Sequence, residues 1–158
     1  MQKKNILLSR VILPICFSLL LYAGYYAWVL QLSAGISPSY VNGILVTSYL
    51  IDNASLRLIN YRGLLERATK NDAKSIKKLT LLEFHNGIGY DHGTVIVSLI
   101  ETVGEDNFIQ SLTRINNEQK RKIRSYIKVG LAYGHNPNFE NKTFEEVFPK
   151  IYIFLNRK

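Results

Sequence analysis

Two histidines, two acids and three glycines gather in one short segment of this chain, EFHNGIGYDHG, which runs from Glu83 to Gly93. Histidine and carboxylate side chains are ligands for zinc and other borderline metals. A histidine beside an aspartate, as in Asp91 and His92, is also the pairing that orients a general base. Glu83, His85, Asp91 and His92 are therefore the candidate catalytic or metal-binding residues of this sequence.

The same segment also has a purely structural interpretation. Asp91 would cap the next helix, Gly87 and Gly89 would adopt positive φ, and Glu83 would lie exposed at the end of the preceding helix. His92 would then be a surface or turn residue. The spacing matches no HExxH, GxSxG or Walker motif. The sequence thus predicts no particular metal, nucleotide or other cofactor, and both interpretations stay open.

An apolar run near the N-terminus predicts on which side of a membrane the segment from Glu83 to Gly93 lies. Residues 11–32, VILPICFSLLLYAGYYAWVLQL, contain no charged side chain, and about twenty apolar residues are enough for a helix to cross a bilayer. Lys3, Lys4 and Arg10 precede the run, and no Lys or Arg follows it until Arg57. The positive-inside rule then places residues 1–10 in the cytoplasm and everything after the run outside it.

Two features of the run bear on its fate. It is longer than the apolar region of about 7–15 residues that is typical of secretory signals, which favours an uncleaved signal-anchor over a cleaved signal peptide. It also contains Cys16, the only cysteine of the chain. The exported part can therefore form no disulfide of its own and no cysteine-based zinc site. We expect a single-pass protein of the cell membrane.

Residues 37–158 have the pattern of one compact all-α domain, because short amphipathic stretches alternate with helix-stop residues. No β-hairpin is predicted, a helical repeat stays open, and the segment from Ile151 to Leu155 is a final helix or a short strand. Helix starts are predicted at Ser37-Pro38, Asn53 or Ser55, Asp72, Asp91, Asp106, Asn117 and Thr143, with stops at Gly104 and Gly134.

Charge is the remaining global property. The chain carries a net charge of +8, and seventeen of its twenty basic residues lie after the apolar run, together with all twelve acids. Such a surface can bind an acidic protein or rest on anionic lipid headgroups, although solvated basic helix faces are also ordinary. Nucleic acid is not an expected ligand outside the cytoplasm. The candidate partner contacts are Arg57, Arg62, Arg67, Lys74, Lys78, Lys120, Arg121, Arg124 and Lys128.

Two classes of function follow from these features. The first is a membrane-anchored helical binding protein of the cell envelope that acts through protein–protein contacts, for example as an inhibitor or immunity-type protein. A structural member of a larger envelope complex would need the same surface and the same tether. The second class is a small membrane-tethered enzyme, metal-dependent or hydrolytic, that uses the segment from Glu83 to His92.

Overall fold

The computed structural model describes residues 18–26, 39–134 and 136–157, and the chain divides into two compact units, Met1–Gly35 and Ile36–Lys158. In the first unit, residues 18–26 are helical and exposed. Among the described residues no helix is both long enough and apolar enough to cross a membrane. The predicted span at 11–32 lies largely outside the described residues, which include only nine of its positions.

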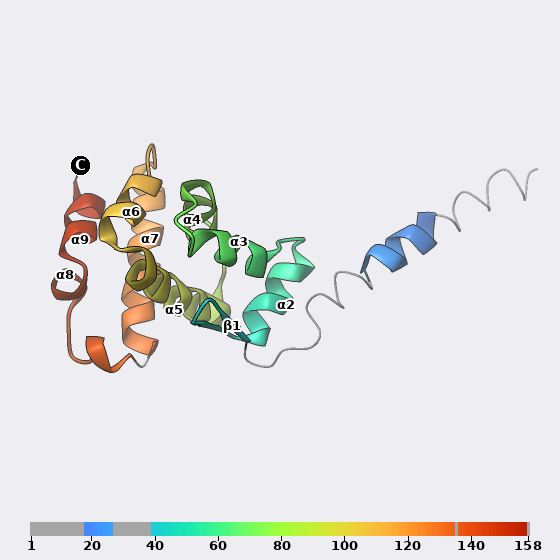
Figure 1. Ribbon diagram of the computed structural model, residues 1–158, viewed down its shortest axis with the longest axis horizontal. Coiled ribbons are helices and arrows are strands. Elements are labelled where there is room, and N and C mark those ends of the chain that lie inside the picture. The colour runs from blue at the N-terminus through green and yellow to red at the C-terminus, as the bar shows by residue number, and fades with distance from the viewer. Residues whose placement is uncertain (1–17, 27–38, 135, 158) are drawn as a thin grey trace, which may run out of the picture. The chain divides into compact units, whose positions relative to one another are not determined.

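The second unit is mostly helical in its described part, which confirms the all-α prediction at the level of fold class. A helical repeat stays a prediction. The chain order of the elements appears in Figure 1. The elements are β1 Ser39–Val41, β2 Ile44–Val46, α2 Ser48–Leu56, α3 Tyr61–Ala68, α4 Ala73–Thr80, α5 Asn86–Val103, α6 Glu105–Ser111, α7 Asn117–Tyr133, the short 3₁₀ helix η1 Pro137–Phe139, α8 Phe144–Val147 and α9 Pro149–Asn156.

The start of this unit differs from the prediction, because a small β-hairpin stands where we expected a helix. Strands β1 and β2 pair antiparallel around Asn42 and Gly43, which both have positive φ, at 48° and 87°. Asn-Gly is the preferred dipeptide of tight hairpin turns for that reason. Val41 and Ile44 point into the core. The predicted absence of a hairpin was wrong, and the turn dipeptide was the signal that could have found it.

Helix boundaries follow the predicted caps at several positions and depart from them at others. Asp72 caps α4, Thr143 forms a capping box with Glu146, and Gly104 follows the last residue of α5, as predicted. The segment after Pro149 is a helix. The cap of α3 is Asn60 instead of the predicted positions seven and five residues earlier, where α2 still continues.

The two longest described helices, α5 and α7, form the centre of the unit and cross at glycines. A Cβ on Gly130 would lie 2.2 Å from the carbonyl oxygen of Gly93, and a Cβ on Gly93 would lie 2.6 Å from the carbonyl oxygen of Tyr126. Neither position has room for a side chain, so the backbones meet directly. In Figure 1, α5 and α7 lie side by side, and α9 contacts α7 as well.

Candidate functional site

The segment that carries the candidate catalytic residues is mostly helix. Helix α5 begins at Asn86, and His85 occupies the N-cap position without a capping hydrogen bond from its side chain. Asp91 therefore lies inside α5, and its predicted role as the cap of that helix was wrong. Gly87 and Gly89 have ordinary helical backbones, whereas Asn86 has the positive φ, 56°. The helix therefore begins before both glycines, whereas the prediction placed its start after them.

His92 is fully buried, which corrects the prediction of a surface or turn residue. Its ring packs among those of Tyr61, Phe84 and Tyr126, with ring centres 4.8–5.8 Å apart. The Tyr61 hydroxyl and the Nδ1 atom of His92 share a hydrogen bond of 2.8 Å. The Nε2 atom has no hydrogen-bond partner among the described residues. We call these four residues the aromatic cage.

Burial sets the charge state of the cage. Loss of hydration lowers the pKa of His92 to about 3, and a backbone group of Leu79 offsets part of that effect. Burial likewise raises the pKa of Tyr61 well above its ordinary value. Both groups are therefore neutral at physiological pH. A neutral imidazole could accept a proton in principle, but no described hollow is lined by His92.

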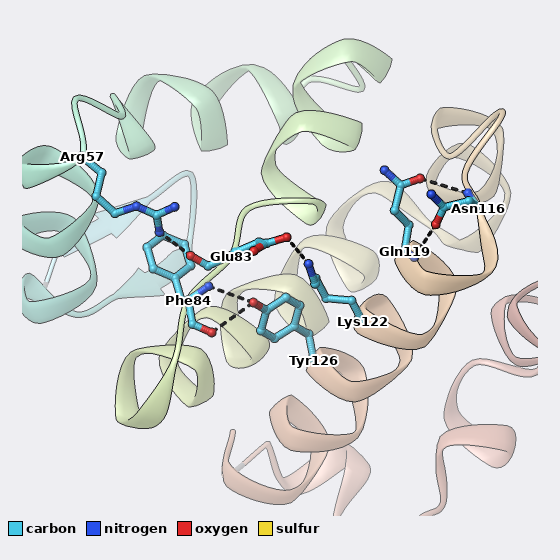
Figure 2. Close-up of polar contacts among 7 residues, drawn as sticks. All are labelled: Arg57, Glu83, Phe84, Asn116, Gln119, Lys122 and Tyr126. Atoms are coloured by element: carbon cyan, nitrogen blue, oxygen red, sulfur yellow. Dashed lines mark hydrogen bonds and ion pairs between the residues drawn. The ribbon is translucent and has the colours of Figure 1, made fainter.

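Phe84 and Tyr126, two members of the aromatic cage, are also joined by hydrogen bonds. The Tyr126 hydroxyl accepts a hydrogen bond of 3.0 Å from the Phe84 backbone N–H, and it lies 3.3 Å from the carbonyl oxygen of the same residue, to which it donates. Figure 2 shows both contacts joining α7 to the irregular stretch before α5. One phenol thus satisfies both backbone groups of a buried residue, which keeps them from being left unpaired.

The three remaining candidates lie apart from the cage interior. Asp91 is half-buried and accepts a hydrogen bond of 2.6 Å from the Thr47 hydroxyl, and Thr47 is the N-cap of α2. Glu83 is exposed and pairs with Lys122 on α7, which lowers the pKa of the Glu83 carboxyl. His85 is exposed. In the described part of the chain, no three His, Cys, Asp or Glu side chains come close enough to share a metal ion.

Two of the five basic candidates that precede α5, which are Arg57, Arg62, Arg67, Lys74 and Lys78, bind to groups of their own fold. Arg57 donates to the backbone carbonyl of Glu83, as Figure 2 shows, and its guanidinium lies 5.3 Å from the centre of the Phe84 ring. Arg67 donates to the Ser75 hydroxyl at 3.2 Å. Because of these contacts, the guanidinium groups of Arg57 and Arg67 are already bound within their own chain. Lys74 and Lys78 are exposed on α4, and Arg62 is half-buried on α3.

The other four basic candidates, Lys120, Arg121, Arg124 and Lys128, all lie on α7, and three of them form a row along its side away from α5. Lys120, Arg124 and Lys128 follow one another at intervals of four residues, the spacing at which helical side chains are neighbours. We call these three residues the α7 basic row. Lys120 donates to the Arg157 carbonyl oxygen at 2.8 Å, and Arg124 donates to the Asn156 side chain. Lys128 has no hydrogen bond or ion pair with any residue that the structure describes.

Three solvent-open hollows are lined by residues of α7. One of about 490 Å³ lies beside the exposed pair of Glu83 and Lys122, and one of about 200 Å³ lies between α7 and the end of α9. Arg121 lines both of them, and its side chain has no partner within the described residues. The third and largest, about 590 Å³, lies at the C-terminal end of α7 beside Lys128.

Sequence reasoning missed the residues that complete these hollows. Asn156 and Arg157 lie 32 and 37 positions from the α7 side chains that they contact. Phe139 and Phe144 line the third hollow from η1 and α8. No local pattern marks such residues, because only the packing of α9 and α8 beside α7 brings them there. Cations four residues apart were visible in the sequence, but the hollows were not.

No protein-family model matches the sequence, and comparison with curated proteins and with solved structures gives no significant match.

Proposed function

We propose that this chain is a membrane-anchored helical binding protein of the cell envelope, and that it holds an acidic protein partner on the outer face of α7. In the proposed topology, residues 1–10 are cytoplasmic, residues 11–32 cross the membrane, and residues 37–158 lie outside the cytoplasm. An inhibitor or immunity-type protein is one binder of this kind, since it neutralises an enzyme simply by covering part of its surface.

One observation carries the choice of surface. Arg121 projects from α7 between two hollows, of about 490 and 200 Å³, with no side-chain partner among the described residues. Arginine is enriched at interface hot spots because its planar, five-donor guanidinium matches carboxylates and also packs against apolar groups. A partner that inserts into the flanking hollows would surround this guanidinium and exclude water from it.

The charge around Arg121 supports an acidic partner. The α7 basic row adds three cations, and Arg157 adds a fourth beside the smaller hollow. Glu83 and Glu118 line the larger hollow, whereas no described acid lines the smaller one, so the positive charge is concentrated beside the smaller hollow. A positive surface steers an acidic partner toward the correct face before contact, which raises the association rate and disfavours basic proteins.

The direct test is to isolate the tagged full-length protein from its native membrane and to measure which proteins remain bound. The variant replaces the row by neutral residues, Lys120→Gln, Arg124→Gln and Lys128→Gln. The matched control, Arg62→Gln, Lys74→Gln and Lys78→Gln, removes the same amount of charge from α3 and α4. We expect a stoichiometric acidic partner that is lost from the first triple variant and kept by the control.

A photo-crosslinking amino acid at position 121 sharpens this result, with the same group at position 74 as its control. Crosslinking of the partner from position 121 alone would support the α7 surface. Equal loss of the partner from both triple variants would reduce the effect to overall charge and would contradict the proposed surface. Crosslinking of position 121 to phospholipid without any protein would replace the partner by the membrane surface.

A further inference from the structure

The largest of the three hollows combines aromatic and charged side chains in its lining. It has a volume of about 590 Å³ and lies where α7, η1 and α8 meet. Its apolar lining comes from Leu131, Ala132, Pro137, Phe139 and Phe144, and its polar lining comes from Lys128, Asn136, Glu140, Asn141 and Lys142. We call it the C-terminal cleft. A hollow of this size can take a whole aromatic side chain and part of the adjoining backbone.

The two phenylalanines that line the cleft each pack against a second aromatic ring. Phe139 meets Phe148 edge to face with ring centres 5.6 Å apart, and Phe144 meets Tyr152 in the same way at 5.6 Å. Phe148 and Phe144 are both buried. Rings packed in this manner lose little further freedom when a ligand arrives, so the cleft is largely formed before binding.

Lys128 connects the cleft to the α7 basic row. It is the last cation of the row and also lines the cleft. From Lys120 to Lys128 the helix rises about 12 Å, because each residue adds about 1.5 Å. An extended peptide covers that distance in about four residues. Carboxylates over the row and an apolar side chain in the cleft would therefore belong to one short segment.

We infer that the partner docks through an acidic segment that carries a single aromatic or large aliphatic side chain, and that this side chain fills the C-terminal cleft. This inference rests on the proposed function and adds the chemistry of the docking segment. Charge holds the segment along α7, and the apolar anchor supplies specificity, since one well-buried side chain often dominates an interface. The lining of the cleft carries two cations, Lys128 and Lys142, against the single carboxylate of Glu140, so it suits an apolar anchor that is flanked by acids.

The test uses two fluorescein-labelled peptides and the full-length protein in phosphatidylcholine nanodiscs. One peptide has phenylalanine between two runs of four acidic residues, and the other has alanine at that place. We expect the phenylalanine peptide to bind about tenfold more tightly, as anisotropy titration would show, because one aromatic ring leaves water. The Ala132→Trp variant should abolish that difference by filling the cleft, whereas Ala73→Trp, on exposed α4, should preserve it.

The outcomes separate the anchor from the charge. Equal affinities of the two peptides, with both weakened in the triple variant of the α7 basic row, would overturn the anchor and leave the acidic partner standing. A phenylalanine advantage that survives in Ala132→Trp would also overturn it. If neither peptide bound more tightly than a neutral peptide of the same length, the proposed surface and the anchor would both be rejected.

Discussion

The two faces of α7 use their polar residues in opposite ways. On the inner face, Tyr126 bonds to the backbone of Phe84, and Gly130 meets the backbone of α5. On the outer face, Arg121 and Lys128 have no partner in the described part of the chain. The inner groups are satisfied inside the fold, and so are Lys120 and Arg124 at the end of α9, whereas Arg121 and Lys128 have no hydrogen bond or ion pair with a described residue.

Residue types alone favour the histidine and aspartate of α5 as functional residues over the cations of α7, and the structure favours the opposite order. His92, which the sequence marked as a catalytic or metal-binding candidate, is buried in the aromatic cage. Asp91, the neighbouring candidate, accepts a hydrogen bond from Thr47, the N-cap of α2. The lysines and arginines of α7, which look like an ordinary solvated face, border three hollows. The proposed surface was therefore chosen by unpaired cations beside hollows, and not by residue types that are common in catalytic sites.

The largest expected effect breaks the inner face. Gly130→Ala should lower the free energy of unfolding by about 3 kcal/mol or more, because its Cβ would overlap the Gly93 carbonyl and force α5 and α7 apart. Gly87→Ala is the matched control, since nothing lies within 4 Å of a Cβ there. That change should stabilise the protein by up to about 1 kcal/mol through helix propensity.

Urea unfolding of the two variants, followed by circular dichroism of the full-length protein in detergent, measures this contrast. If both alanine variants were equally stable, the close approach of α5 and α7 would be wrong.

The second effect tests the burial of His92 by pH. Its pKa is about 3 in the folded chain and ordinarily about 6.5, so the unfolded chain binds the proton more readily. The stabilisation is complete above pH 6.5 and is lost as the pH falls toward 3, at about 1.4 kcal/mol for each pH unit. From pH 6.5 to pH 5 the protein should therefore lose about 2 kcal/mol through this residue.

Substitution separates His92 from the other groups that titrate in this range. His92→Asn should remove most of the acid-dependent loss, while His85→Asn, at the exposed end of the same segment, should retain it. The measurement is the difference in unfolding free energy between pH 7 and pH 5 for the wild type and for both variants. Identical slopes for the wild type and His92→Asn would mean that His92 is accessible to protons in the folded state.

Prediction from the sequence succeeded where the physics was local. The caps at Asp72 and Thr143 depend on side chains and backbone groups within three residues, and both are confirmed. The hairpin at Asn42-Gly43 was equally local but was read as helix, because Val41, Ile44 and Leu45 also fit a helical spacing. Two periods can fit a stretch this short, and the turn dipeptide should have decided between them.

The candidate site depended on contacts that no local pattern encodes. His92 is buried because Tyr61 and Tyr126, 31 and 34 residues away, close over it, and their positions follow from how α3 and α7 pack against α5. The segment from Glu83 to His92 was expected to be a loop between two helices, but all of it after His85 belongs to α5, and its four candidate side chains serve separate contacts. A catalytic role for these four residues stays a prediction, because the structure does not bring their side chains together.

The smallest expected effect sharpens the comparison from the outer side. Replacing Arg121 and Lys128 together by alanine should change the free energy of unfolding by less than about 0.5 kcal/mol, because neither side chain has a hydrogen bond or ion pair with a described residue and alanine favours the helix. The same double variant should lose most of its affinity for the partner. A large loss of stability instead would show that these cations serve the fold, and the division of α7 into a structural and a binding face would then fail.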